Sequence, residues 1–197
     1  MQKEQSGAQT QHEHNPISRR RFLAYGMLTL TSAIFLPHEK AFASVNSILS
    51  VERSLSFYNL HTDEELSTVY WRKGEYQPEA LADINYLLRD YRTGDVKKID
   101  PKLLDLLHTL HKKVGSSEPF QVISGYRSPK TNAMLARRSR GVAKHSMHLL
   151  GKAIDIRLPE CGLDCLHKAA VGLRAGGVGY YPSSDFVHVD VGRVRYW

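Results

Sequence analysis

The segment 146–155, Ser-Met-His-Leu-Leu-Gly-Lys-Ala-Ile-Asp, contains two side chains of the kinds that bind zinc. His148 and Asp155 lie seven residues apart within it, and a third candidate ligand, His188, follows in Phe-Val-His-Val-Asp at 186–190. Two imidazoles and one carboxylate make three protein ligands, and zinc held by three ligands keeps a fourth position for water. This set of residues therefore predicts a catalytic zinc site in a metallohydrolase.

Two predicted strands would carry two of these ligands. In 153–158, apolar residues alternate with Asp155, and in 186–191 three valines alternate with His188 and Asp190. Because successive side chains of a strand point to opposite faces of a sheet, the apolar residues would face the core and the polar ones the other side. If the two strands are adjacent, they present Asp155 and His188 to one cleft.

Two further functional side chains are expected to come from loops. His148 precedes the first of these strands, and Gly151 permits the tight backbone path that would bring it back to the cleft. The short apolar run 120–123 is typical of a buried strand and leads into Ser-Gly-Tyr-Arg-Ser-Pro at 124–129, where Gly and Pro favour a loop. Arg127 is thus placed at the end of a strand.

The remaining elements indicate one mixed α and β domain. Aromatic and β-branched runs at 55–60 and 66–71 predict an N-terminal hairpin, because the connection between them is polar. Leucines and isoleucines at helical spacing predict two helices that pack against a sheet, one beginning at Pro78 and one capped by Asp100. A helical turn or two is expected at 131–138.

The N-terminus has the pattern of a twin-arginine export signal. Ser-Arg-Arg-Arg-Phe-Leu at 18–23 is followed by an apolar run and by Ala-Phe-Ala at 41–43, which is typical of a cleavage site. The run is shorter than the roughly 20 apolar residues of a spanning helix, so no stable membrane insertion is expected after cleavage. We expect a signal peptide over 1–43, a domain over 44–197, and delivery to the periplasm.

The basic charge belongs mainly to the predicted exported domain. The formal net charge of the 197 residues is +7, and residues 1–43 hold only five of the 27 Lys and Arg. An exported basic protein meets anionic wall polymers or lipid headgroups more often than nucleic acid. The basic run at 137–141 lacks interleaved aromatic residues, so it is interpreted as a solvated surface and no nucleic-acid partner is expected.

The cysteines, Cys161 and Cys165, are four residues apart, and the periplasm, to which the chain is expected to be exported, permits disulfides. If 163–173 is helical, the two sulfur atoms are close, but spacing alone does not establish the geometry of a bridge. A disulfide and a pair of free thiols both remain open.

A family resemblance rests on motifs distributed over nearly the whole chain. The sequence resembles the M15 metallopeptidases, the family of zinc D-Ala-D-Ala carboxypeptidases and dipeptidases, and particularly its murein endopeptidase K-like branch, formerly a domain of unknown function. The matching segments are 123–128, 139–143, the Ser-x-His-x-x-Gly-x-Ala-x-Asp motif at 146–155, 174–182, 186–188 and 192–197.

The resemblance implies a small α+β domain whose central antiparallel sheet is flanked by helices and holds zinc on one face through His148, Asp155 and His188. It also implies hydrolysis of the peptide cross-links between peptidoglycan stem peptides during wall growth. A zinc carboxypeptidase that trims stem peptides and a noncatalytic peptidoglycan-binding module are the alternatives. The sequence leaves the oligomeric state open.

The resemblance also suggests roles for residues around the metal. Arg127 matches the position that steadies the scissile carbonyl or a substrate carboxylate, and Asp185 matches the general base three residues before the last ligand. Asp190 competes for the role of base, because a regular strand would turn Asp185 away unless the strand begins after it. Ser146 would bind substrate or brace the ligand loop, and His145 would point elsewhere if its segment is extended.

Overall fold

A single mixed sheet organises the part of the chain that the computed structural model describes, residues 52–139 and 142–197. The predicted export signal at 1–43 lies outside the described residues. The sheet order is β3-β2-β1-β4-β5-β7-β6-β8. Its strands are β1 (Arg53–Asn59), β2 (Glu65–Arg72), β3 (Glu75–Tyr76), β4 (Phe120–Ser124), β5 (Ala153–Arg157), β6 (Gly177–Tyr181), β7 (Phe186–Asp190) and β8 (Arg195–Tyr196).

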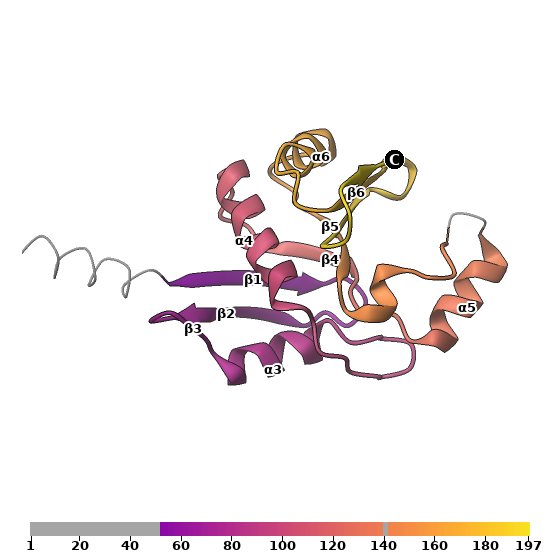
Figure 1. The fold of residues 1–197 in the computed structure, drawn as a ribbon, viewed down its shortest axis with the longest axis horizontal. Coiled ribbons are helices and arrows are strands. Elements are labelled where there is room, and N and C mark those ends of the chain that lie inside the picture. Colours follow the sequence, from indigo (N-terminus) through magenta and orange to yellow (C-terminus); the bar gives the residue numbers. More distant parts are fainter. Residues whose placement is uncertain (1–51, 140–141) are drawn as a thin grey trace, which may run out of the picture. The chain divides into compact units, whose positions relative to one another are not determined.

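Helices connect and flank these strands (Figure 1). Four α-helices and two short 3-10 helices lie within the described residues: α3 (Pro78–Leu87), α4 (Pro101–Val114), α5 (Pro129–Arg138), α6 (Leu163–Val171), η1 (Met147–Leu150) and η2 (Pro182–Ser184). The predicted hairpin is β1 and β2, and the two predicted leucine-rich helices are α3 and α4. Helix α5 has ten residues, longer than the predicted turn or two, because Ser128 caps it and Pro129 begins it.

The predicted α+β fold is confirmed, and its sheet is mainly antiparallel. Two pairings are parallel, β1 with β4 and β6 with β8. The chain leaves the β1–β2 hairpin, passes through α3 and α4, and returns beside β1, and such a long crossover permits parallel pairing. The pairings that carry the predicted ligands, β4 with β5 and β5 with β7, are antiparallel.

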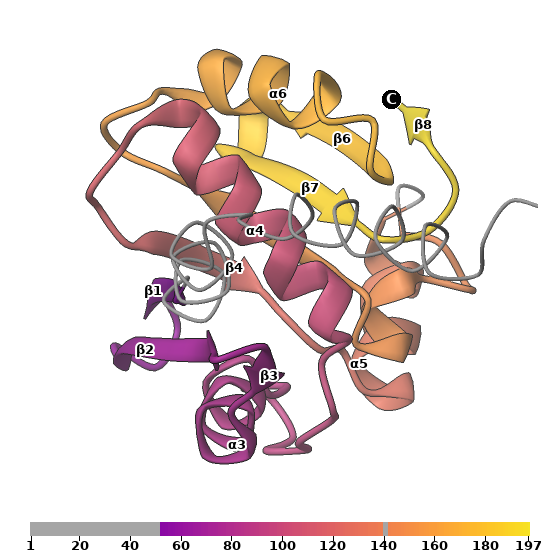
Figure 2. The ribbon, with the colours of Figure 1, turned by 60° about the vertical axis from the view of Figure 1, so that its left-hand side comes forward.

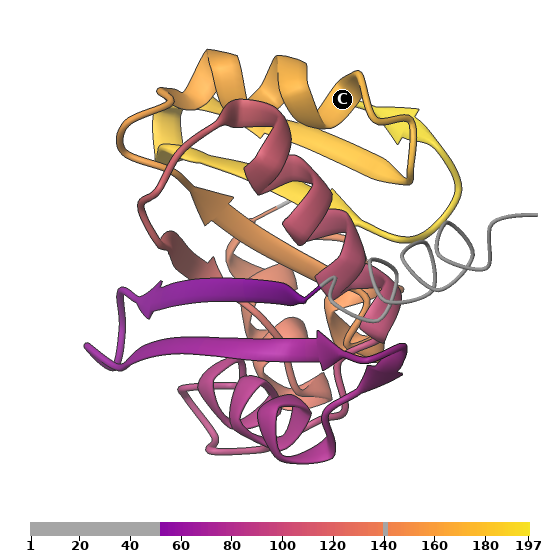
Figure 3. The same ribbon diagram turned by 90° about the vertical axis from the view of Figure 1, so that its left-hand side faces the viewer.

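The core lies where α4 and α6 pack against the sheet. Figures 2 and 3 show α4 running across the strands, with α6 beside β6 and β7. The apolar residues of β5 and β7, such as Ile154 and Val189, share one buried cluster with α4 residues such as Leu107 and with Leu166 of α6. Strand alternation then turns Asp155 to the other face of the sheet.

The loop that carries Arg127 is docked onto the end of α3. The amide of Tyr126 donates to the carbonyl of Leu88 at 2.8 Å, and the amide of Ser128 donates to the buried Asp90 carboxylate at 2.8 Å. Gly125 lies so close that an added Cβ would meet the Leu88 oxygen at 2.5 Å. Contacts within the protein itself therefore hold this loop in place.

Gly151 allows the sharp turn between η1 and β5. Its φ is +66°, and an added Cβ would lie 2.4 Å from the carbonyl oxygen of Lys98. Its own carbonyl accepts from the amide of Asp100 at 2.9 Å, at the start of α4. The backbone therefore has no room for a side chain where the chain turns after His148.

Among the described residues, no helix has the length and apolarity needed to cross a bilayer.

We predict that Gly151→Ala destabilises the fold more than Gly94→Ala. Both glycines have positive φ, but no atom lies within 4 Å of a Cβ added at Gly94. The control should lose about 1–2 kcal/mol from left-handed strain alone. Gly151→Ala should lose about 1–3 kcal/mol more, because a methyl group is forced into filled space. Urea unfolding measures both, and equal losses would contradict the packing argument.

Candidate metal centre

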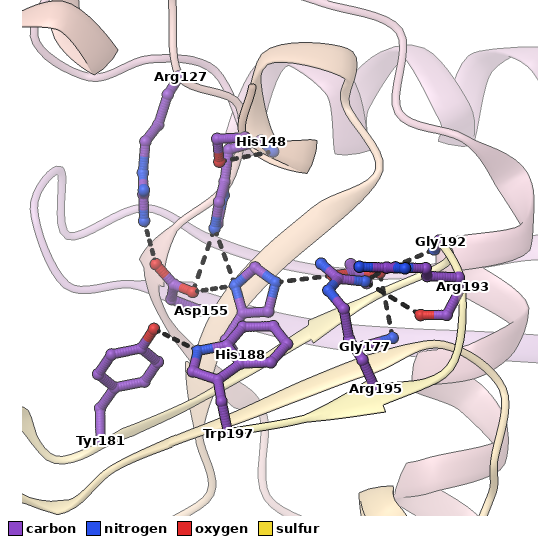
Figure 4. Close-up of polar contacts among 12 residues, drawn as sticks. Arg127, His148, Asp155, Gly177, Tyr181, His188, Gly192, Arg193, Arg195 and Trp197 are labelled. Atoms are coloured by element: carbon purple, nitrogen blue, oxygen red, sulfur yellow. Dashed lines mark hydrogen bonds and ion pairs between the residues drawn. The ribbon is translucent and has the colours of Figure 1, made fainter. Parts of the chain in front are cut away.

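Three buried side chains converge on the face of the sheet away from the α4 and α6 core. Asp155 in β5 and His188 in β7 are direct cross-strand partners, and His148 arrives from η1. Their exposed fractions are 0% for His148, 2% for Asp155 and 8% for His188. Figure 4 shows the two imidazoles and the carboxylate pointing toward one another. The structure thus brings together the three side chains that the sequence analysis selected as ligands.

The spacing of the three donor atoms fits a small cation. Nε2 of His148 lies 3.2 Å from Oδ1 of Asp155 and 3.1 Å from Nδ1 of His188. Nδ1 of His188 lies 2.8 Å from the same Asp155 oxygen. Ligand atoms around tetrahedral zinc, with bonds near 2.0–2.1 Å, are separated by about 3.3 Å. The group could therefore hold a metal ion after a small expansion.

Hydrogen bonds on the far side of each ring fix which nitrogen faces the centre. Nδ1 of His148 lies 2.7 Å from the carbonyl oxygen of Gly125, which can only accept, so this nitrogen carries the proton. Nε2 of His188 lies 3.1 Å from a carboxylate oxygen of Asp190 and donates to it. In the neutral rings, the other two nitrogens then turn lone pairs toward Asp155. Such outer partners commonly orient the histidines of metal sites.

The electrostatics favour a charged carboxylate and shift the pKa values of the two rings in opposite directions. Burial alone would raise the pKa of Asp155, but His148, His188 and Arg127 outweigh it and hold the pKa well below its usual range. Burial lowers the pKa of His148 despite the opposing charge of Asp155. Burial would also lower the pKa of His188, yet its hydrogen bonds to Asp155 and Asp190 raise it above the usual value. Of the two rings, His188 is therefore the better proton acceptor when no metal is bound.

Arg127 contacts the metal-ligand group directly. Its guanidinium donates to Oδ2 of Asp155, while its Nε donates to Oγ of Ser124 at 2.9 Å. Oδ1 of Asp155, which faces the imidazoles, is left for the metal. Arg127 therefore orients the carboxylate and also brings a fixed positive charge to the wall of the cleft.

Ser146 and His145 both line the cleft beside the cluster. The Ser146 hydroxyl caps η1 by accepting from the amide of His148 at 3.3 Å, so it braces the ligand loop. The expectation that His145 points elsewhere assumed an extended segment. The segment before Ser146 is a turn, and this is why the imidazole reaches the cleft.

Asp190 is committed to structural contacts. It is fully buried, and besides His188 it accepts from Arg195 at 2.6 Å and from the amides of Gly177 and Gly192 at 3.1 and 2.7 Å. Burial would raise its pKa, but these donors hold the pKa well below its usual range. A carboxylate so engaged orients His188 and is a poor proton acceptor, which argues against Asp190 as the base.

Asp185 is placed at the edge of the site and is turned away from it. It adopts φ 52°, and β7 begins immediately after it at Phe186, so the strand alternation that would oppose it to His188 does not apply. Its carboxylate pairs with Arg157 at 2.6 Å and is largely exposed. Asp185 and Arg157 line a neighbouring hollow. Among the described residues that line the cleft beside His148, Asp155 and His188, Asp185 is not found.

The cleft has a volume of about 450 Å³ and contains residues that the sequence analysis did not select. Among them are Tyr181, Phe186, Arg195 and Trp197. In the sequence, these four residues lie in segments that match the family motifs but carry no ligand spacing of their own. Nothing in the local sequence shows that the C-terminal strand returns beside β6 and brings Trp197 over His188, with ring centroids 5.3 Å apart.

The two cysteines lie together at the start of α6. Their sulfur atoms are 2.6 Å apart. The prediction of proximity is confirmed, and the choice between thiols and a disulfide stays open.

Together, the α+β fold and a His2Asp group in an open cleft define a metal-dependent hydrolase of the M15 peptidase type. Residues 48–197 match the family model described as peptidoglycan L,D-endopeptidase MepK, and the chain belongs to this family. It is 46% identical over 180 residues to the peptidoglycan L,D-endopeptidase MepK of Escherichia coli K12, covering 91% of this chain and 97% of the relative. It is 42% identical over 183 residues to the probable peptidoglycan L,D-endopeptidase MepK of Haemophilus influenzae, covering 91% and 95%.

We predict that Asp190→Asn weakens zinc binding by about 10–100-fold, because the amide is a weaker acceptor for the His188 ring. Zinc affinity is measured by competition with a chromophoric chelator, and circular dichroism confirms that the variant is folded. Asp164→Asn is the control, since Asp164 pairs only with the exposed Lys168 among described side chains. Unchanged affinity in Asp190→Asn would show that the outer hydrogen bond does not support the metal.

We predict that zinc affinity decreases as pH falls. The pKa of His188 is raised in the metal-free site, so below that pKa a proton occupies the ring that must release it to bind metal. The loss should approach about tenfold per pH unit once the solution is below the raised pKa, which lies above about 6.5. Zinc titrations from about pH 8 to about 5.5 measure it. An affinity that stays constant over this range contradicts the proton competition.

Proposed function

We propose that this protein is a zinc-dependent peptidoglycan endopeptidase that hydrolyses the cross-links between stem peptides. The observation that carries the proposal is the group of three donor atoms from His148, Asp155 and His188, within 2.8–3.2 Å of one another in an open cleft. Membership in the MepK family supports peptidoglycan as the substrate.

The chain's own residues would hold and tune the metal. His148, Asp155 and His188 bind it, while the Gly125 carbonyl and Asp190 keep the ligating nitrogens free of protons. A zinc ion bound there would lower the pKa of a water molecule toward neutrality and polarise a peptide carbonyl. The buried position of the ligands keeps these charges from being screened by solvent.

Arg127 is proposed to position the substrate. Two of its nitrogen atoms are engaged by Asp155 and Ser124, and Nη1 makes no hydrogen bond within residues 52–139 and 142–197, so it is available to a carbonyl or carboxylate of the stem peptide. Ser146 is proposed to contact the same substrate from the cleft wall in addition to capping η1. Both residues lie beside His148, which would place the scissile bond near the ligands.

Asp185 is proposed as the general base. The support is its position immediately before β7, three residues from His188, with a left-handed backbone that frees it from strand alternation. Arg157, which holds its carboxylate, follows Asp155 by two residues in β5 and therefore lies on the same face of the sheet. A rotation of the Asp185 side chain away from Arg157 would bring the carboxylate toward the cleft.

We also infer that the protein is exported through the twin-arginine pathway to the periplasm, with the signal at 1–43 and the catalytic domain at 44–197. The sequence pattern at 18–43 and a peptidoglycan substrate support this location. Immunoblots of cell fractions should show a shortened periplasmic form. Replacement of Arg19 and Arg20 by lysine should retain the full-length form in the cytoplasm, and an unchanged periplasmic form would contradict twin-arginine export.

We predict that the purified protein converts cross-linked muropeptide dimers to monomers only when zinc is bound. Zinc-loaded, chelated and His148→Ala samples are compared by mass spectrometry, which also identifies the bond cut. Activity should disappear on chelation and return with zinc, and His148→Ala should have none. Loss of a terminal residue from intact dimers would indicate a carboxypeptidase. Binding without any product would indicate a noncatalytic module.

We predict that Asp185→Asn lowers kcat by about 10²–10⁴-fold with little change in zinc affinity, since general-base catalysis usually contributes that much. Arg157→Gln is the matched variant, because it releases the Asp185 carboxylate and should keep or increase kcat. If Asp185→Asn keeps full activity, Asp185 is not the base. The exposed histidine of the cleft, His145, is then tested by His145→Gln.

A further inference from the structure

Three aromatic side chains line part of the cleft and are called its aromatic wall. Tyr181 of β6 and Phe186 of β7 stack with ring centroids 4.6 Å apart, and Trp197 joins them from the end of the chain beyond β8. Trp197 is 48% exposed although it is the largest side chain in the wall. A large ring held half-exposed at the mouth of a metal site indicates a functional surface more than a packing element.

The register of β6 and β7 creates the space for this wall. Gly179 of β6 lies directly across from His188 of β7. Tyr181 is two residues further along β6, so the Tyr181 side chain is a diagonal neighbour of His188 on the same face of the sheet. A Cβ at Gly179 would meet the Trp197 indole at 2.7 Å and the Tyr181 ring at 2.8 Å. The glycine therefore leaves room for both rings to lie beside the metal-ligand group.

Trp197 is held firmly in this space. Its amide donates to the carbonyl of Val178 at 3.2 Å, and its carbonyl accepts from the amide of Tyr180 at 2.9 Å. The Arg195 guanidinium lies 4.9 Å from the centroid of its ring, and the ring packs against His188. An indole fixed by its own backbone and by its neighbours can position another group accurately.

That other group is the Tyr181 hydroxyl. Nε1 of Trp197 lies 2.7 Å from the phenol oxygen. An indole N–H can only donate, so the phenol oxygen must accept, and its own O–H hydrogen must point elsewhere. Within residues 52–139 and 142–197, no side chain or backbone group accepts that hydrogen. The contact with Trp197 thus leaves a hydrogen-bond donor available in the cleft.

The position of this donor differs from that of Arg127. Figure 4 shows the Tyr181 hydroxyl on the side of Asp155 opposite the Arg127 guanidinium, with the phenol directed toward the ligand group. Arg127 already donates to Asp155 and Ser124, whereas the phenol O–H has no such commitment. In a peptide hydrolysis, negative charge develops on the scissile carbonyl oxygen, and a fixed donor aimed at that oxygen stabilises the transition state.

We propose that Tyr181 is a catalytic residue whose hydroxyl donates a hydrogen bond to the oxyanion of the scissile peptide, and that Trp197 is the positioning residue that aims it. The inference rests on the proposed endopeptidase function. The step forms and breaks no covalent bond to Tyr181, and its proton stays on the phenol oxygen throughout. The substrate class is a peptide whose carbonyl becomes tetrahedral in the cleft.

Single-atom and conservative substitutions test the proposal with the purified, zinc-loaded, processed protein on cross-linked muropeptides. Tyr181→Phe should lower kcat by about 10²–10³-fold, the usual effect of removing an oxyanion donor, and leave KM and zinc affinity nearly unchanged. Trp197→Phe should lower kcat by about tenfold, since it keeps an aromatic ring but removes the donor that orients the phenol. Tyr180→Phe is the matched control, because the adjacent Tyr180 stacks on His167 of α6.

A double variant separates positioning from packing. If Trp197 acts through the Tyr181 hydroxyl, Trp197→Phe should cause no further loss of kcat in the Tyr181→Phe background. Additive losses would overturn the positioning role, and a Tyr181→Phe enzyme with the kcat of the Tyr180→Phe control would overturn the catalytic role. A lower zinc affinity in Tyr181→Phe would make the residue structural. Failure of the wild-type enzyme itself to cut dimers would overturn the endopeptidase function on which both roles depend.

Discussion

The rest of the site depends on keeping protons off the inner nitrogen atoms of two buried imidazoles. With Asp155 charged between them, three lone-pair donors face one another at 2.8–3.2 Å, an arrangement that is stable only when positive charge is supplied. Arg127 supplies part of that charge, and a metal ion or a proton on His188 supplies the remainder. Removing either outer acceptor, the Gly125 carbonyl or the Asp190 carboxylate, would let a ring turn its N–H inward and oppose the metal.

These two acceptors are fixed by different parts of the fold. Gly125 belongs to the loop after β4, which the Leu88 carbonyl and the Asp90 carboxylate hold against the end of α3. Asp190 ends β7 and is held by Arg195 and by the amides of Gly177 and Gly192, so the C-terminal strand stabilises it. The N-terminal half of the domain thus sets the tautomer of His148, and the C-terminal end sets that of His188. Packing changes far from the metal can therefore alter its affinity.

The convergence of the candidate ligands was predictable because strand alternation is local. The apolar residues of 153–158 and 186–191 face the core, so Asp155 and His188 must lie on the opposite face of the sheet. Because β5 and β7 are adjacent, the two side chains then lie side by side. The parallel pairing of β1 with β4 depends on a crossover between distant segments, which no local pattern reveals. Alternation also placed Asp190 on the correct face but could not show that four donors occupy it. The turn that brings His145 to the cleft, and the return of Trp197, were missed for the same reason.

The resting position of Asp185 has a physical explanation that is compatible with a role as base. An exposed carboxylate beside an arginine gains only a modest net energy from the pair, about 0–1 kcal/mol, so the contact with Arg157 is easily exchanged. The left-handed backbone at Asp185 lies between η2 and β7, where the side chain can rotate without disturbing the ladder that holds His188. Entry of a peptide into the cleft would displace water and strengthen the attraction of the carboxylate to the metal side. In the proposed mechanism, a change of rotamer would move the Asp185 carboxylate from Arg157 toward the cleft.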